Sequence, residues 1–112
     1  MTELDFAALG AAAPLAAALR ERDYQNPTPV QARVLEAADA DLLVSSQTGS
    51  GKTVAFGLII GRALLAGGDK LARGERPRAL VVAPTRELAA QVQRELGWLF
   101  ARTGGRIAAC TG

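Results

Sequence analysis

Hydrophobic positions along the chain follow two different spacings. In some segments apolar residues recur every three to four positions, which is the period of a helix with one buried face. This spacing predicts four helices, at about 14–22, 30–38, 52–65 and 86–102. Other segments are short and extended, with the runs of apolar residues that are typical of a buried strand. These runs predict three strands, at 41–45, 79–83 and from about 106 to 112.

Strands and helices alternate from residue 41 onward. This order is typical of right-handed β-α-β units, which build a parallel sheet with helices on both faces. We therefore expect an α/β domain with a parallel sheet of about three strands. The helix at 52–65 is apolar almost all round and should be buried on most sides. Because the chain stops just after a strand, we expect a piece of a larger domain, whose exposed sheet edge would let it self-associate.

The composition narrows the cellular setting and the chemistry. With 112 residues, 49% of them hydrophobic, and a net charge of +2, the chain suits one globular domain without a strong overall charge. A single cysteine, Cys110, excludes an internal disulfide and fits a reducing compartment, and we expect it to be buried in the third strand. The absence of histidine excludes histidine acid–base catalysis. We expect a cytoplasmic protein, because the sequence has neither a secretory leader nor ~18 consecutive uncharged apolar residues.

The segment between the first strand and the third helix has the chemistry of a phosphate-binding loop. Its glycines would let successive backbone N–H groups turn inward around phosphate oxygens, and the following helix adds its positive N-terminal end. Lys52 would reach the β- and γ-phosphates, and the Thr53 hydroxyl would ligate Mg²⁺. The predicted loop consists of Ser46, Gln47, Thr48, Gly49, Ser50, Gly51, Lys52 and Thr53.

This loop departs from the common pattern at one place, because the pattern has glycine where this chain has Ser46. The alternative interpretation is a Gly/Ser/Thr turn between a strand and a helix, with a solvated lysine. A phosphate loop alone also leaves the class of protein open, because kinases, GTPases and motor ATPases all carry one.

Two further segments indicate which class of P-loop protein this is. One is the run YQNPTPVQ from Tyr24 to Gln31, and the other is PTRELA, which begins at Pro84. Together with the loop they resemble, in order, the Q motif, motif I and motif Ia of DEAD-box ATP-dependent RNA helicases. Phe6 matches the isolated aromatic residue upstream of the Q motif in that family. The resemblance covers nearly the whole chain.

The resemblance implies a partial RecA-like P-loop domain that fills residues 1–112 and belongs to the first helicase lobe. Residues 1–40 would form the Q-motif region, and residues 41–112 would form the core that carries the P-loop and motif Ia. The rest of lobe 1 and all of lobe 2 would then be absent.

Four residues are implied to hold the adenine end of ATP. Gln31 would read the adenine edge, because its amide offers a donor and an acceptor, and Tyr24 would pack on the ring. Phe6 and Asn26 complete the implied set. The alternatives are an ordinary half-buried tyrosine at a helix end and a glutamine solvated at a helix start. The family often has glycine where this chain has Asp23, which leaves the local backbone angle open.

The segment after the second strand is implied to hold RNA. The Thr85 hydroxyl, the Arg86 guanidinium and helix N–H groups would converge at the carboxyl end of a strand, where ligands bind in open α/β sheets. They would grip the sugar-phosphate backbone of a single RNA strand without reading its sequence. The implied RNA-binding set is Pro84, Thr85, Arg86 and Gly112. The alternative is that Thr85 caps the following helix.

The intact protein would couple ATP hydrolysis to the unwinding or remodelling of RNA by closing two lobes. Hydrolysis needs an acidic metal holder, a carboxylate that orients water and arginines from the facing lobe. Of the catalytic groups, only Lys52 and Thr53 have a match here, so we expect the chain alone to bind adenine nucleotide at most and not to hydrolyse ATP. The alternatives are another P-loop ATPase, such as a DNA translocase or small-molecule kinase, and an RNA- or protein-binding module without nucleotide. The sequence leaves the RNA substrate and the oligomeric state open.

Overall fold

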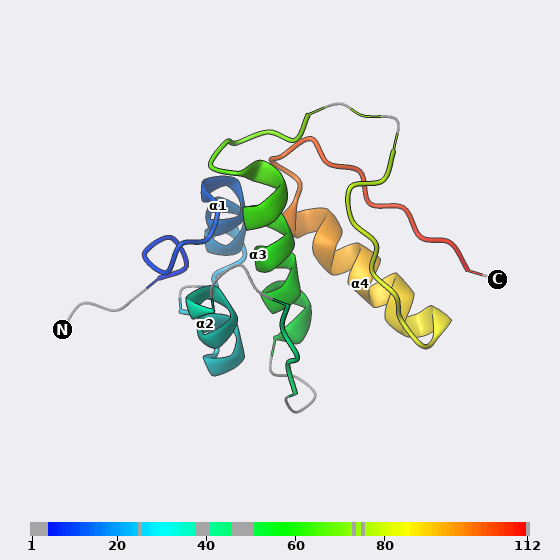
Figure 1. Ribbon diagram of the computed structural model, residues 1–112, viewed down its shortest axis with the longest axis horizontal. Coiled ribbons are helices and arrows are strands. Elements are labelled where there is room, and N and C mark those ends of the chain that lie inside the picture. Colours follow the sequence, from blue (N-terminus) through cyan, green and yellow to red (C-terminus); the bar gives the residue numbers. More distant parts are fainter. Residues whose placement is uncertain are drawn as a thin grey trace.

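The computed structural model describes residues 5–24, 26–37, 41–45, 51–72, 74 and 76–111. Within these ranges it contains four helices that pack on one another, namely α1 (Ala13–Glu21), α2 (Pro29–Glu36), α3 (Lys52–Leu65) and α4 (Arg86–Leu99) (Figure 1). All four predicted helices are confirmed, although α4 ends at Leu99 instead of about residue 102. In the described part of the chain, no helix is both long and apolar enough to cross a membrane.

The helix α3 lies at the centre of the packing and contacts both α2 and α4. Two glycines one turn apart let its neighbours come close. A Cβ atom at Gly57 would lie 2.7 Å from Leu99 Cδ2 on α4, and one at Gly61 would lie 2.5 Å from Leu15 Cδ2 on α1. Both distances are shorter than van der Waals contact, so any larger residue would push a buried leucine aside. The predicted burial of this helix is confirmed, because its large apolar side chains are all buried or half-buried.

One hydrophobic core joins the four helices and the segment before α1. Its buried members are Phe6, Ala11, Leu15, Ala16, Leu19, Leu35, Val54, Leu58, Leu65, Leu96, Leu99 and Phe100. At the edge of this core the Arg62 guanidinium donates to the carbonyl oxygens of Leu35, at 2.9 Å, and Ala37, at 3.1 Å. Carbonyl groups at a helix C-terminus lack intrahelical donors. Arg62 therefore fastens the end of α2 onto α3.

The predicted strands do not form. The described residues of the segments 41–45, 79–83 and 106–111 contain no strand or bridge, so the expected parallel sheet of an α/β, RecA-like domain is wrong for this structure. Cys110, expected inside the third strand, is exposed. Figure 1 shows the three segments running separately, one beside the start of α3, one across α4 and one away from α4 towards the C-terminal end.

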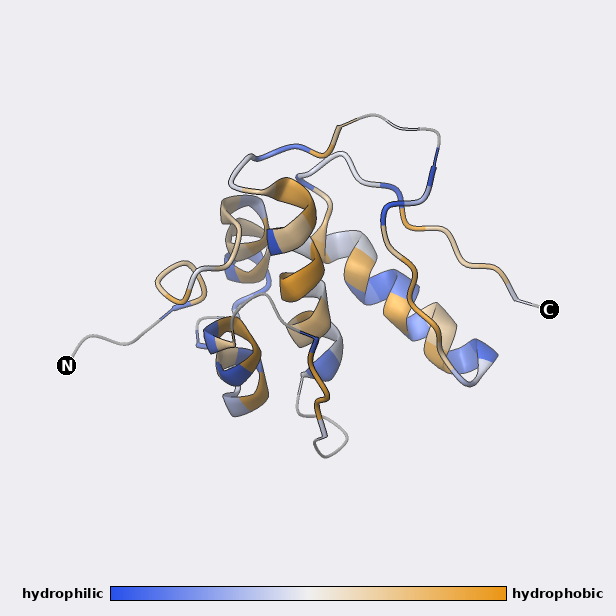
Figure 2. Ribbon diagram, viewed as in Figure 1, coloured by the Kyte–Doolittle hydropathy of each residue, from blue (hydrophilic) through white to orange (hydrophobic). Residues whose placement is uncertain are grey.

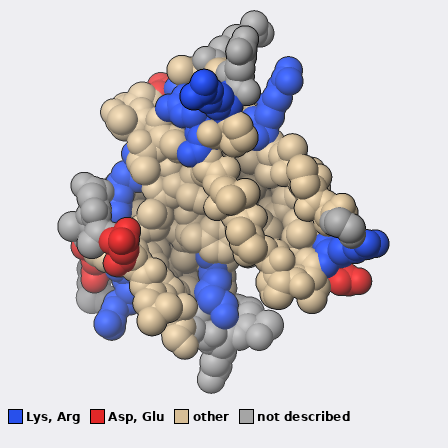
Figure 3. Space-filling model, turned by 45° about the vertical axis from the view of Figure 1, so that its right-hand side comes forward, with Lys and Arg blue, Asp and Glu red and all other residues tan. Residues whose placement is uncertain are grey.

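The strands do not form because a strand needs a neighbouring strand for its hydrogen bonds, whereas a helix does not. A helix bonds its own backbone groups, whereas a strand bonds those of a neighbour. Here most of the large apolar side chains of the helices pack against one another, and on α4 Leu88 stays 38% exposed with no strand beside it. Figure 2 shows that the extended segments carry hydrophobic residues. In the first two segments these side chains are exposed, with Leu43 at 100%, Leu80 at 86% and Val82 at 83%, whereas Ile107 of the third packs against the core. Figure 3, turned by 45° from the view of Figure 1, shows a broad uncharged area with Lys, Arg, Asp and Glu around its edge.

Candidate functional site

The start of α2 is held by a reciprocal pair of hydrogen bonds between Thr28 and Gln31. The Thr28 hydroxyl accepts from the Gln31 backbone N–H at 3.4 Å, and the Gln31 Oε1 atom accepts from the Thr28 backbone N–H at 2.9 Å. This is a capping box, which satisfies two backbone donors that a helix start leaves without partners. Pro29, at the first turn, has no N–H and suits that position. The interpretation of Gln31 as a solvated helix-start residue is wrong, because Gln31 is only 2% exposed.

The same glutamine side chain reaches the end of the phosphate loop. Gln31 Nε2 donates to the carbonyl oxygen of Gly51 at 3.2 Å, across 20 residues of sequence. Gly51 has φ +85° and directly precedes α3. A Cβ atom at Gly51 would overlap Gln31 Nε2 and lie 3.4 Å from the Thr28 hydroxyl oxygen. Glycine is therefore favoured here, because any other residue would strain the backbone angle and displace the Gln31 amide.

The phosphate loop itself is described only at its C-terminal end. The predicted residues Ser46–Ser50 lie outside the described residues, whereas Gly51, Lys52 and Thr53 lie inside them. Lys52 and Thr53 form the first turn of α3, with Lys52 exposed and Thr53 half-buried. Helix geometry directs the backbone N–H groups of a first turn towards the space before the helix, where an anion would sit.

The left-handed angle at Gly51, followed at once by a helix, suits a tight turn around a phosphate group. The binding of a nucleotide phosphate at this loop stays a prediction. In the described part of the chain no cluster of three or more His, Cys, Asp or Glu side chains could hold a metal ion.

Tyr24 lies at the C-terminal end of α1, in a backbone arrangement that closes the helix. The Asp23 N–H donates to the Arg20 carbonyl at 3.1 Å, and the Tyr24 N–H donates to the Leu19 carbonyl at 2.9 Å. This is the Schellman pattern, whose turn residue is usually glycine in the left-handed region. Asp23 takes that position with φ +66°. The backbone angle that the sequence left open is therefore the one that glycine would adopt.

The Tyr24 ring stacks on Trp98, a residue of α4 that sequence reasoning did not single out. The ring centroids are 5.8 Å apart and the planes differ by 7°. The Arg22 guanidinium lies 4.6 Å from the centre of the Trp98 ring, which is a cation–π contact. Trp98 is the chain's single tryptophan, but nothing in the sequence pairs it with a tyrosine 74 positions earlier.

Phe6 and Asn26, the other residues expected near adenine, differ in exposure. Phe6 is 2% exposed and belongs to the hydrophobic core, whereas Asn26 is exposed.

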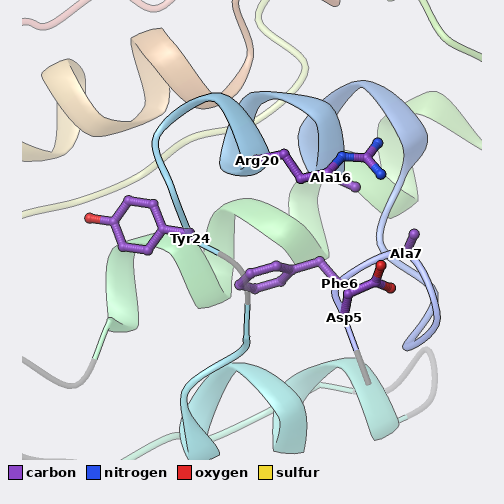
Figure 4. A pocket seen from close by; sticks show the side chains of 6 residues that line it. All are labelled: Asp5, Phe6, Ala7, Ala16, Arg20 and Tyr24. Atoms are coloured by element: carbon purple, nitrogen blue, oxygen red, sulfur yellow. The ribbon is translucent and has the colours of Figure 1, made fainter. Parts of the chain in front are cut away.

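A small hollow beside Phe6 and Tyr24 has a volume of about 10 Å³, which is the space of about one water molecule. It is lined by Asp5, Phe6, Ala7, Ala16, Arg20 and Tyr24 (Figure 4). An adenine ring does not fit into this hollow.

The predicted RNA segment forms the start of α4. Thr85 is the N-cap, and its hydroxyl accepts from the Leu88 N–H at 3.1 Å. The capping interpretation of Thr85 is thus confirmed, and it leaves the RNA role as a prediction. Pro84, Thr85 and Arg86 are exposed, but no strand precedes them, and Gly112 lies outside the described residues. The N-terminal ends of α3 and α4 both lie towards the lower side in Figure 1, and the two helices diverge in that direction.

Comparison with known proteins places the chain in a family. A family model described as DEAD/DEAH box helicase matches residues 28–112. The DEAD-box ATP-dependent RNA helicase 52A of Oryza sativa subsp. japonica is 43% identical over 101 residues, which cover 80% of this chain and 17% of that protein. The ATP-dependent RNA helicase RhlB of Pasteurella multocida is 40% identical over 107 residues, which cover 93% of this chain and 25% of that protein. The chain thus spans a quarter or less of either relative.

The matched residues include the capping box of α2, the described end of the phosphate loop and the start of α4. They are part of the segments on which the resemblance in the sequence was based, since Phe6 and residues 24–27 lie before the matched range. Since the family model covers most of the chain, this chain belongs to the DEAD/DEAH box helicase family.

Proposed function

We propose that this chain is the ATP-binding part of an ATP-dependent RNA helicase, which couples ATP hydrolysis to the unwinding or remodelling of RNA. The observation that carries the proposal is the Gln31 side chain, which joins the capping box of α2 to Gly51 at the end of the phosphate loop. The segment expected to read the base and the loop expected to hold the phosphates are thus in direct contact. Family membership and the names of the relatives support the same activity.

At the base end, Gln31 would discriminate adenine from guanine. Its two observed hydrogen bonds use one amide N–H and one lone pair of Oε1. An amide group has a second N–H and a second lone pair. Those two remaining groups complement adenine, which offers an acceptor at N7 and a donor at N6. Tyr24, 45% exposed, would stack on the ring.

At the phosphate end, the first turn of α3 would carry the charge. Its backbone N–H groups and positive helix end favour phosphate oxygens. The Lys52 ammonium would neutralise the β- and γ-phosphates, and the Thr53 hydroxyl would ligate Mg²⁺. Bound Mg²⁺ supplies charge neutralisation at the phosphates that are cleaved.

The start of α4 would hold the second ligand, a single strand of RNA. Pro84, Thr85 and Arg86 are exposed at a helix N-terminus, where backbone N–H groups and a guanidinium suit phosphate oxygens. Such contacts follow the backbone of the strand and do not read its bases.

The residues 1–112 alone would bind ADP or ATP without hydrolysing it, because hydrolysis needs acidic metal and water-positioning groups that have no match here. A phosphate-release assay with ATP and RNA checks this point. Release that RNA stimulates and that Lys52→Ala abolishes would contradict it.

Calorimetric titration with ADP and GDP tests the proposed site. Lys52→Ala should abolish ADP binding. Lys70→Ala is the matched control, because Lys70 is also an exposed lysine and bonds only the Arg102 carbonyl in the described structure. We expect ADP to bind at least tenfold more tightly than GDP, and Lys70→Ala to leave both affinities unchanged. Equal affinity for ADP and GDP would indicate another class of P-loop ATPase. Loss of binding in both lysine variants would contradict the assignment of Lys52.

A further inference from the structure

The contact between Tyr24 and Trp98 lies at the edge of the hydrophobic core, against which Trp98 packs and of which Tyr24 is not a member. Tyr24 is 45% exposed, and one face of its ring lies parallel to Trp98 at a centroid distance of 5.8 Å. Trp98 is half-buried on α4 and packs against the core, so it forms the fixed side of the pair. A ring stacked on Trp98 is covered by it on one face only, and Tyr24 as a whole residue is 45% exposed.

Tyr24 is held from two directions. Its backbone is fixed by the hydrogen bond from its N–H to the Leu19 carbonyl, in the closing turn of α1. Its ring is fixed by Trp98. The Arg22 guanidinium over the Trp98 ring holds Trp98 to the same turn. An aromatic side chain ordered before its ligand arrives loses less conformational entropy on binding.

We infer that Trp98 is a positioning residue for the nucleobase: it holds the Tyr24 ring with one face open for adenine to stack on. The inference rests on the proposed function, in which Tyr24 packs against adenine. It also assigns a second role to α4, whose first residues are the proposed RNA contact and whose last turn carries Trp98. One helix would then contact RNA at its start and support the base-stacking residue near its end.

The single tryptophan makes the stack directly observable, because all indole fluorescence of the chain comes from Trp98. ADP brings a base to Tyr24, whereas inorganic pyrophosphate occupies only the phosphate loop. We expect ADP to change the Trp98 emission and pyrophosphate to leave it unchanged at saturation. An equal response to both ligands would contradict the inference, since it would come from the loop and not from the base.

Affinity provides the second test, measured by calorimetry on chains whose helical circular dichroism matches the wild type. Trp98→Leu should weaken ADP roughly three- to tenfold, the range of one aromatic pair, and leave pyrophosphate affinity unchanged. Trp98→Phe preserves a stacking ring and should stay within about twofold of wild type. A merely structural role for Trp98 would weaken both ligands together. Tighter ADP binding by Trp98→Leu would show that Trp98 covers Tyr24 and would overturn the inference.

A double-variant cycle shows whether Trp98 acts through Tyr24. Once Tyr24→Leu has removed the ring, adding Trp98→Leu should cost no further affinity. If Trp98→Leu weakens ADP binding as much in the Tyr24→Leu chain as in the wild type, the inference is overturned. If wild-type ADP binding is normal and Trp98→Leu changes nothing, the inference fails and the proposed function stands. If the wild-type chain binds pyrophosphate but not ADP, both fail.

Discussion

Replacing Gly51 with alanine tests the junction between α2 and the phosphate loop. The glycine has φ +85°, an angle that alanine adopts at a cost. The new Cβ atom would overlap Gln31 Nε2 and lie 3.2 Å from Gln31 Cδ. The glutamine amide would have to move, and with it the hydrogen bonds to the Gly51 carbonyl and to the Thr28 N–H.

The expected loss of stability in Gly51→Ala is the sum of two contributions. A left-handed alanine costs about 1–2 kcal/mol relative to glycine. Losing the Gln31–Gly51 hydrogen bond costs about 0.5–1.5 kcal/mol. We therefore expect Gly51→Ala to lower the free energy of unfolding by about 2–3 kcal/mol, which is a large share of the stability of a small domain.

Urea unfolding followed by circular dichroism at 222 nm measures this loss. Gly97→Ala is the matched control, because Gly97 lies inside α4 and a Cβ atom there would meet nothing within 4 Å. The control should raise the free energy of unfolding by about 0.5–1 kcal/mol through helix propensity. If Gly51→Ala behaves like Gly97→Ala, the geometry at Gly51 does not limit the residue at that position.

A double-variant cycle identifies the source of the loss. In a Gln31→Ala chain both the overlap and the hydrogen bond are already gone, so Gly51→Ala should cost about 1 kcal/mol less than it does in the wild type. Additive losses, within about 0.3–0.5 kcal/mol, would refute the contact between Gln31 and Gly51.

Two further substitutions test the ends of helices by the same urea unfolding. Asp23→Gly should raise the free energy of unfolding by about 0.5–1 kcal/mol, because Asp23 holds a left-handed angle that glycine adopts freely; no gain would contradict the closing turn of α1. Thr85→Ala should lower it by about 1 kcal/mol through loss of the N-cap bond to Leu88. Thr85→Ser retains the hydroxyl and should cost only a few tenths of a kcal/mol, and an equal loss in both variants would argue against the cap.

The four helices could be predicted because their signals are local. Each signal acts within one or two turns of the helix. The signals are a proline in the first turn, apolar residues three to four positions apart and a threonine just before the helix. The start of α2 is an example, since Thr28, Pro29 and Gln31 supply the cap by themselves. The end of α4 was placed too late, because turns tied to Phe100, such as the bond from the Thr103 hydroxyl to its carbonyl, replace the last helical turn.

The three predicted strands failed because a strand depends on a neighbour that no local pattern supplies. The segments 41–45 and 79–83 have the short apolar runs that are typical of buried strands, yet their large apolar side chains lie outside the core that the helices form with Phe6, Ala11 and Phe100. The close packing of that core depends on Gly57 and Gly61, whose importance appears only once Leu99 and Leu15 are seen against them.

The sequence by itself determined the family, the four helices and the residue types proposed to meet base, phosphate and RNA, because each of these depends on short-range order along the chain. Tertiary structure decided which of those residues touch. It joined Gln31 to Gly51 across 20 residues and Tyr24 to Trp98 on another helix. It also decided that no sheet forms among the described residues. Contacts between distant segments depend on how whole helices pack, and a pattern that repeats every three or four residues carries no information about that packing.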